Sequence, residues 1–133
     1  MQKFTTFLMF SGDAEEAMTF YTGIFANSSI VNIKRYKAGE PGKEGSVMHA
    51  TFSLNGQEFM CIDSAVTHAF TFTPAISIYV SFDNEAELDK VFDVLAKGGK
   101  VMMPLGAYPF SKKFGWCADK FGVSWQLSID SKA

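Results

Sequence analysis

Residues 111–127, with the sequence SKKFGWCADKFGVSWQL, predict a strand, a tight turn and a second strand. The turn is Asp119-Lys120-Phe121-Gly122, and aspartate and glycine are typical residues of such turns. In the second strand, Trp125 and Leu127 alternate with Gln126. Because neighbouring residues of a strand point to opposite faces, we expect Trp125 and Leu127 to face a helix and Gln126 to face away from it, into a cavity.

The elements before this closing hairpin follow from apolar periodicity and from turn residues. The patterns predict strands at 4–10, 29–36, 46–54, 58–63, 75–82 and 100–105, a helix at about 14–25, a helix from Asp83 or Asn84 to Gly98, and loops at 37–45 and 106–111. Asp13 and Glu16 resemble a capping box at the start of the first helix. Asn55-Gly56 is a strong signal for a two-residue hairpin turn.

The second half of the chain repeats the order of elements of the first half. Adding 71 to the residue number maps Phe7 onto Ile78 and Tyr21 onto Phe92, and adding 66 maps Phe59 onto Trp125. The sequence therefore predicts one α+β domain over 1–133 that is built from two βαβββ modules. We place them at about 3–65 and about 75–130, with a connector at 66–74.

Composition bounds the class of protein. Hydrophobic residues make up 47% and charged residues 20% of the 133 residues, which excludes disorder, and the 14 Phe suggest a large cavity wall or an oligomer interface. A net charge of -2 gives no general attraction to nucleic acid or to a membrane surface. We find no signal peptide and no apolar run long enough to span a bilayer, so we expect a soluble cytoplasmic protein with two reduced cysteines.

Four motifs resemble those of one family. They are FSGDAEEA at 10–17 leading to Phe20-Tyr21, MHA at 48–50, MPL at 103–105 and FGWCADKFGVSW at 114–125. The chain resembles the PhnB-like group, the "3-demethylubiquinone-9 3-methyltransferase" domain family of the vicinal oxygen chelate superfamily, which also contains glyoxalase I and the bleomycin and fosfomycin resistance proteins. The resemblance implies modules whose mixed sheets curl around a concave, glyoxalase-like cavity, and it implies a homodimer.

The resemblance also implies positions for a metal and a cofactor. Metal-using relatives would place ligands at Thr6, at Met60 or Cys61, at Ser77 and at Gln126. None of these is the His or Glu that a divalent ion would require there, so we expect no metal. The methyltransferase label would require S-adenosylmethionine, but neither strand-to-helix turn, at 11–13 and at 82–84, resembles a nucleotide loop, so we expect no cofactor.

The candidate site residues are those that the repeat and the resemblance place on the cavity wall. They are Thr6, Leu8, His49, Met60, Ser77, Tyr79, Trp116 and Gln126. His49 is the candidate acid or base, although a histidine bonded across the sheet would look the same in the sequence. Tyr108 and Phe110 either frame the mouth of the pocket with Trp116 or pack in a dimer. We expect solvent exposure for His68, a buried and inert thiol for Cys61, and turn hydrogen bonds for Asp63 and Asp119.

Three functions are consistent with these residues. The first is a metal-free protein that binds a small, largely apolar or aromatic molecule as a homodimer. The second is an enzyme that uses His49, with Gln126 or Tyr79, for proton transfer on a carbonyl or phenolic substrate. The third is a structural module without a ligand. The sequence leaves open which molecule is bound, whether modules pair within or between chains, and what the loop at 37–45 does.

Overall fold

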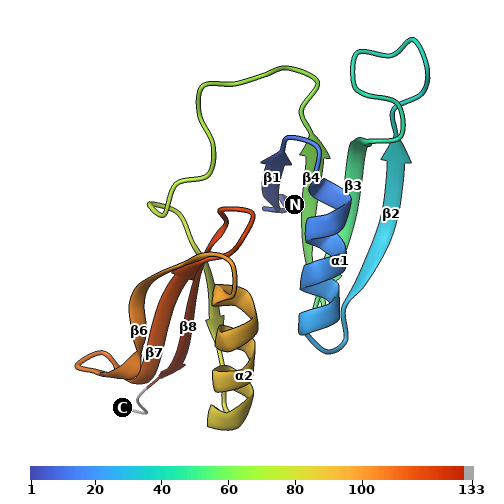
Figure 1. Ribbon diagram of the computed structural model, residues 1–133. Coiled ribbons are helices and arrows are strands. Elements are labelled where there is room, and N and C mark those ends of the chain that lie inside the picture. Colours follow the sequence, from blue (N-terminus) through green and yellow to red (C-terminus); the bar gives the residue numbers. More distant parts are fainter. Residues whose placement is uncertain (131–133) are drawn as a thin grey trace. The chain divides into compact units, whose positions relative to one another are not determined.

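The computed structural model describes residues 1–130 (Figure 1). In chain order its elements are β1 (Thr6–Phe10), α1 (Ala14–Ile24), β2 (Ser29–Arg35), β3 (Val47–Leu54), β4 (Gln57–Asp63), β5 (Ile78–Ser81), α2 (Glu85–Ala96), β6 (Lys100–Tyr108), β7 (Ser111–Ala118) and β8 (Ser124–Asp130). Each half has the order β-α-β-β-β, which confirms the predicted α+β class and the repeat. The chain divides into two compact units, of which the first is Met1–Ala69 and the second begins at Phe70.

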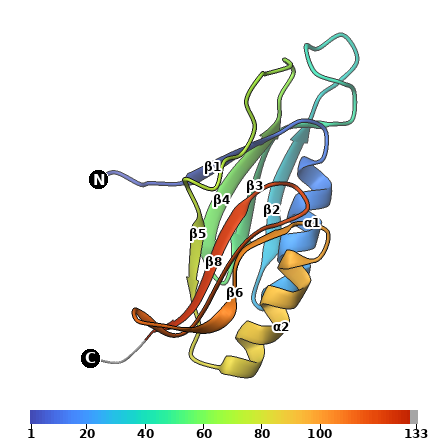
Figure 2. The same cartoon turned by 60° about the vertical axis from the view of Figure 1, so that its left-hand side comes forward.

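The first unit is a four-stranded mixed sheet in the order β1-β4-β3-β2. Its first strand pairs in parallel with its last strand, and the other two pairings are antiparallel. Helix α1 packs on β2, β3 and β4, so it covers one face of the sheet (Figure 2). The core between them contains Leu8, Phe10, Ala14, Ala17, Met18, Tyr21, Ala50, Phe52, Leu54, Phe59 and Cys61.

The second unit has the same arrangement, with the strand order β5-β8-β7-β6 and a parallel pairing of β5 with β8. Helix α2 packs on β6, β7 and β8 (Figures 1 and 2). Trp125 and Leu127 are fully buried on the helix side, as the alternation of β8 predicts. Gly115 allows this packing, because a Cβ at that position would lie 2.5 Å from Cε1 of Phe92.

Two turns test the sequence-based boundaries. The turn at Asn55-Gly56 is confirmed, with φ angles of 49° and 86° that a type I′ hairpin requires. The predicted loop at 106–111 is wrong, since β6 continues to Tyr108 and β7 begins at Ser111. The ring of Phe110 packs edge-on against the ring of Phe114, with centroids 4.9 Å apart, and this aromatic contact stabilises a hairpin with a very short turn.

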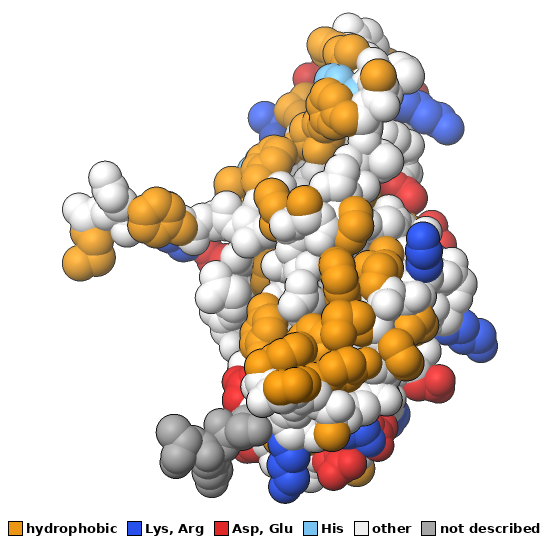
Figure 3. All heavy atoms as spheres, turned by 90° about the vertical axis from the view of Figure 1, so that its left-hand side faces the viewer, with side chains coloured by type: hydrophobic (Ala, Val, Ile, Leu, Met, Phe, Trp, Pro, Cys, Tyr) orange, Lys and Arg blue, Asp and Glu red, His pale blue; other side chains and the backbone are white. Residues whose placement is uncertain are grey.

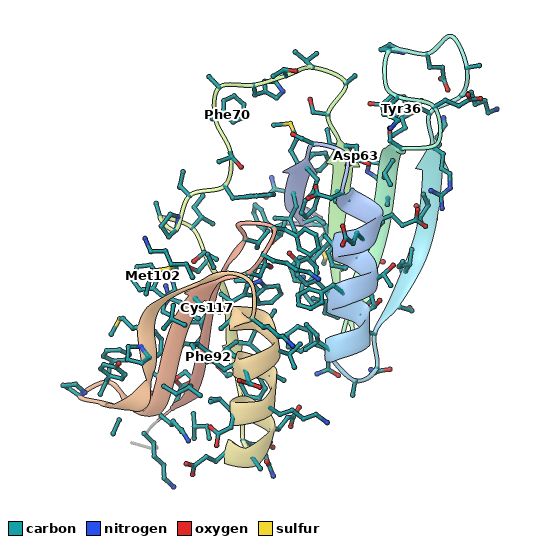
Figure 4. All side chains as sticks on the ribbon, viewed as in Figure 1. Tyr36, Asp63, Phe70, Phe92, Met102 and Cys117 are labelled. Atoms are coloured by element: carbon teal, nitrogen blue, oxygen red, sulfur yellow. The ribbon has the colours of Figure 1, made fainter. Side chains whose placement is uncertain are left out.

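The start of α1 also differs from the prediction. The side chain of Asp13 makes no capping hydrogen bond, so the predicted capping box does not form. Instead, the buried carboxylate of Asp63, at the end of β4, accepts the N–H groups of Gly12 at 2.8 Å and of Ala14 at 3.0 Å (Figure 4). A second oxygen of Asp63 accepts the N–H of Val47 at 3.0 Å. One carboxylate therefore connects the start of the helix to two strands.

The offset in residue number between corresponding positions of the two modules is larger by one at their first strands than the sequence predicts. Phe7 is the ladder partner of Met60, and Tyr79 is the ladder partner of Gln126. Phe7 and Tyr79 therefore correspond, which is an offset of 79 − 7 = 72 rather than 71. The helices keep the offset of 71, because the corresponding residues Tyr21 and Phe92 are both buried. This difference of one residue decides which side chains of β1 and β5 face the helix.

Candidate functional site

The candidate site lies on the face of the second sheet that is opposite α2, which we call the helix-free face. It contains the side chains of Ser77, Tyr79, Ser81, Trp116, Ser124, Gln126, Ser128 and Asp130. Their positions follow from the ladder, where Gln126 pairs with Tyr79 on one side and with Trp116 on the other. Four of the candidate residues from the sequence, Ser77, Tyr79, Trp116 and Gln126, are thus brought together on one face.

A neutral hydrogen-bond network occupies one end of this face. The indole N–H of Trp116 donates to Oγ of Ser124 at 2.9 Å. The hydroxyls of Ser124 and Ser77 are bonded to each other at 2.6 Å. The side-chain N–H of Gln126 donates to Oγ of Ser77 at 3.1 Å. None of these four side chains carries a charge, and Ser77, Trp116 and Gln126 are only partly buried, so the network can meet a ligand.

A charged network lies further along β8. The Tyr79 hydroxyl donates to Asp130 at 2.9 Å, and the hydroxyls of Ser128 and Ser81 donate to the same carboxylate at 2.7 and 3.3 Å. These bonds, led by the one from Ser128, lower the pKa of Asp130. Partial burial raises the pKa of Tyr79, and its bond to Asp130 acts in the same direction. The phenol therefore stays protonated, and its ring is half exposed at the middle of the face.

Aromatic side chains accompany the two networks. Tyr108 and Phe110 stack with ring centroids 5.8 Å apart, and both pack edge-on against Phe114. Phe114 is the ladder partner of Ser128, so this cluster belongs to the helix-free face. Figure 3 shows hydrophobic side chains gathered in the lower part of the view. The position of Tyr108 and Phe110 at a pocket mouth remains a prediction.

The first sheet carries a different set of side chains on its face opposite α1. Met60 is the ladder partner of Phe7 and of Thr51. The ring of His49 lies near the ring of Phe7, with centroids 6.3 Å apart and planes inclined by 45°. This face thus combines apolar side chains with three titratable groups, because Lys34 is the ladder partner of His49 and Glu58 is the ladder partner of Ser53. His49 and Met60 belong to the first unit, whereas Tyr79 and Gln126 belong to the second.

Two candidate residues lie on the wrong face. Thr6 and Leu8 are the ladder partners of Phe59 and Cys61, whose side chains are buried under α1. Leu8 is itself only 7% exposed and is part of the core. The expectation that Thr6 and Leu8 share a wall with Met60 is therefore wrong. Its cause is the offset of 71, which the register of the parallel ladder replaces by 72.

The side chains at the positions implied for a metal do not fit a divalent cation. In the ladder, the residues beside Met60 and Gln126 on the first strands are Phe7 and Tyr79. The implied positions Thr6, Met60 or Cys61, Ser77 and Gln126 supply hydroxyls, a thioether or a thiol and a neutral amide, and the ladder neighbours add a ring and a protonated phenol. All of these are poor ligands for a hard or borderline ion. Among residues 1–130, no group of three or more His, Cys, Asp or Glu is arranged to hold a metal.

The remaining residues with reactive or titratable side chains have structural surroundings. Cys61 and Cys117 are free and buried, and burial, together with Asp63 and Asp119 respectively, raises the pKa of each thiol to about 12. His68 is exposed, and its Nε2 lies 3.0 Å from the hydroxyl of Ser64. Asp119 accepts the N–H groups of Phe121 and Val123 in its own turn, as predicted.

Sequence reasoning missed most of the polar residues around Gln126. Ser124, Ser128 and Asp130 lie on the same face of β8 and take part in the two networks. A signal for them exists, because residues 124–130 read SWQLSID, in which every second residue is polar. Extending the alternation that identified Gln126 by one step on one side and two steps on the other would have found all three.

Comparisons with known proteins agree with this architecture. The family described as 3-demethylubiquinone-9 3-methyltransferase matches residues 2–128. The PhnB protein of Bacillus cereus is 66% identical over 96% of this chain and 99% of its own, with a TM-score of 0.93. Protein PA1353 from Pseudomonas aeruginosa is 26% identical over 99% of this chain and 100% of its own, with a TM-score of 0.78. FosX, a fosfomycin resistance protein from Listeria monocytogenes, is 14% identical over 98% of this chain and 92% of its own, with a TM-score of 0.65, and shares the fold.

Proposed function

This chain belongs to the 3-demethylubiquinone-9 3-methyltransferase family, within the superfamily of the glyoxalases and fosfomycin resistance proteins, and we propose that it binds a small, largely apolar or aromatic molecule. The ligand would lie against the helix-free face of the second sheet. This proposal rests on one observation: the side chains of four candidate residues lie next to one another on that face, namely Trp116, Tyr79, Gln126 and Ser77. Aromatic rings supply area for stacking, and a few polar groups fix the orientation of a ligand.

We propose further that binding uses neither a metal nor S-adenosylmethionine. The support for binding without a metal is that the side chains at the implied metal positions are poor ligands for a divalent cation. For the second part, the backbone amides that a cofactor would meet at the strand-to-helix turns are already bonded within the protein. Asp63 accepts those of Gly12 and Ala14, and the side chain of Asn84 accepts the N–H of Glu87 at 2.8 Å. These turns therefore do not fit a nucleotide-like cofactor.

A thermal-shift screen against small aromatic compounds tests the binding proposal. A ligand at 100 times its Kd stabilises the folded protein by about 2.7 kcal/mol, which corresponds to a rise in Tm of about 5–15 °C for a chain of this size. Hits should lose their effect in Gln126→Leu, and should keep it in Gln57→Leu, an exposed glutamine on β4. A screen without any hit would favour a structural module instead.

A second candidate is an enzyme that uses His49 as an acid or base. The observation in its favour is that His49 lies on the face of the first sheet opposite α1, beside the ring of Phe7. A carbonyl or phenolic substrate turned over by the protein, with activity lost in His49→Gln and retained in His68→Gln, would support catalysis. Unchanged turnover in His49→Gln would exclude it.

The homodimer and the cytoplasmic location are part of the same proposal. The support for a dimer is the number of large apolar side chains that remain exposed, among them Phe4 at 87% and Ile76 at 82%. Sedimentation velocity should give twice the mass of 14.7 kDa, and a single-chain mass would contradict the dimer. Neither helix within residues 1–130 is long and apolar enough to cross a membrane.

A further inference from the structure

The neutral network of the second sheet has a direction, which follows from burial. The indole of Trp116 can only donate, so Ser124 accepts at its oxygen. Ser124 is 2% exposed, and the hydroxyl of Ser77 is the one acceptor that the structure gives for its hydrogen within residues 1–130. If Ser77 donated instead, a buried hydroxyl hydrogen would be left without an acceptor, which is unfavourable. Ser124 therefore donates to Ser77.

The donor-to-acceptor direction of these hydrogen bonds determines which donors and acceptors remain for a ligand. Ser77 accepts two hydrogen bonds, one from Ser124 and one from Gln126, so its own hydrogen is free to donate outward. In the structure Gln126 donates one N–H to Ser77, and its oxygen is left to accept. The site thus presents the hydroxyl hydrogen of Ser77 and the oxygen of Gln126 side by side, together with the second N–H of Gln126, and without a charge.

Building on the proposed function, we infer that the ligand is a neutral aromatic molecule that carries an amide group. Its carbonyl oxygen accepts the hydrogen of Ser77, its N–H donates to the oxygen of Gln126, and its ring packs against Trp116. A carboxylate would lack the N–H and would meet the acceptor of Gln126 with a negative charge. An amidinium would lack the acceptor that Ser77 requires. Either mismatch leaves a polar group of the site without a partner.

The test compares four probes of similar size: benzamide, benzoate, benzamidine and ethylbenzene. The readout is the indole N–H signal in the ¹H–¹⁵N NMR spectrum, for which the chain has a built-in control. Its 2 Trp lie on opposite faces of the same sheet: Trp116 donates to Ser124, whereas Trp125 donates to Asp119 at 2.8 Å on the helix side. Benzamide should bind most tightly and shift the signal of Trp116, while that of Trp125 stays in place.

Variants sharpen the test. Ser77→Ala should weaken benzamide binding about fivefold, the effect of one neutral hydrogen bond, and should leave ethylbenzene binding unchanged. Ser29→Ala, an exposed serine on β2 of the first unit, is the control and should change neither. Gln126→Glu should make benzamidine the tightest probe. An unchanged Trp125 signal in each variant verifies the native fold.

Two outcomes separate this inference from the proposal on which it rests. Tighter binding of benzoate or benzamidine to the native protein, or equal binding of all four probes with a shift at Trp116, overturns the amide inference and leaves the binding function in place. No shift at Trp116 with any probe up to its solubility limit overturns both.

Discussion

Replacing Asp63 by asparagine should destabilise the protein far more than any substitution of Asp13, although the sequence assigns the helix cap to Asp13. One oxygen of Asp63 accepts the N–H groups of Gly12 and Ala14, and the other accepts that of Val47. In Asp63→Asn the first two bonds become neutral, which costs about 1 kcal/mol each, and an NH₂ group faces the N–H of Val47, which costs about 2 kcal/mol. The expected loss is about 4 kcal/mol.

The controls come from Asp13, whose side chain makes no capping bond. Asp13→Asn and Asp13→Ala should both change the free energy of unfolding by less than about 0.5 kcal/mol, whereas a functioning cap would lose about 1 kcal/mol in the alanine variant. Urea unfolding followed by far-UV circular dichroism measures these values. Because both Trp residues belong to the second unit, Trp fluorescence should report separately whether that unit is affected. A loss in Asp63→Asn no larger than in Asp13→Ala would refute the reasoning.

Two further predictions concern the core. Gly115→Ala should lower the free energy of unfolding by about 1–3 kcal/mol, because the new Cβ would lie 2.5 Å from Cε1 of Phe92. Gly23→Ala on helix α1 should be neutral or stabilising, because a Cβ there would have nothing within 4 Å. Calorimetry of the two variants checks this prediction, and equal effects would contradict it. The thiols of Cys61 and Cys117, whose pKa values burial raises to about 12, should be inert to a thiol reagent at pH 8 in the folded protein and reactive in urea. Fast labelling at pH 8 in native buffer would contradict the burial. Because the folded pKa of each thiol lies above its unfolded value, the contribution of the thiols to stability should be complete below about pH 8.5 and should decline as the pH rises toward 12.

The sequence predicts most of the fold because the apolar alternation of strands and the helical periodicity are local. The alternation around Gln126 correctly separated Trp125 and Leu127 from the helix-free face. The same alternation would have identified Ser124, Ser128 and Asp130 had it been followed to the end of β8. The polar residues of the candidate site on β8 could therefore have been predicted from the sequence.

Long-range pairing explains the errors. The side on which Leu8 lies depends on the register of β1 against β4, which are separated by most of the first unit, and no turn length fixes the register of a parallel pair. Likewise, the carboxylate that receives the first amides of α1 comes from Asp63, about 50 residues after Gly12 and Ala14. A capping box is a local pattern, so the local rule selected Asp13 instead.

The position of β5 has a consequence for motion. Strand β5 has only four residues, and within its unit it pairs with β8 alone. The paired residues, such as Tyr79 and Gln126, lie far apart in the sequence. Short edge strands open more easily than central ones, so β5 should show the fastest amide hydrogen exchange of the second sheet. Opening of β5 would carry away Tyr79 and the adjacent Ser77 while Trp116 and Gln126 stay on the central strands. A ligand bridging Ser77 and Gln126 would hold β5 in the sheet, so that occupancy of the site could be measured as slowed exchange in β5.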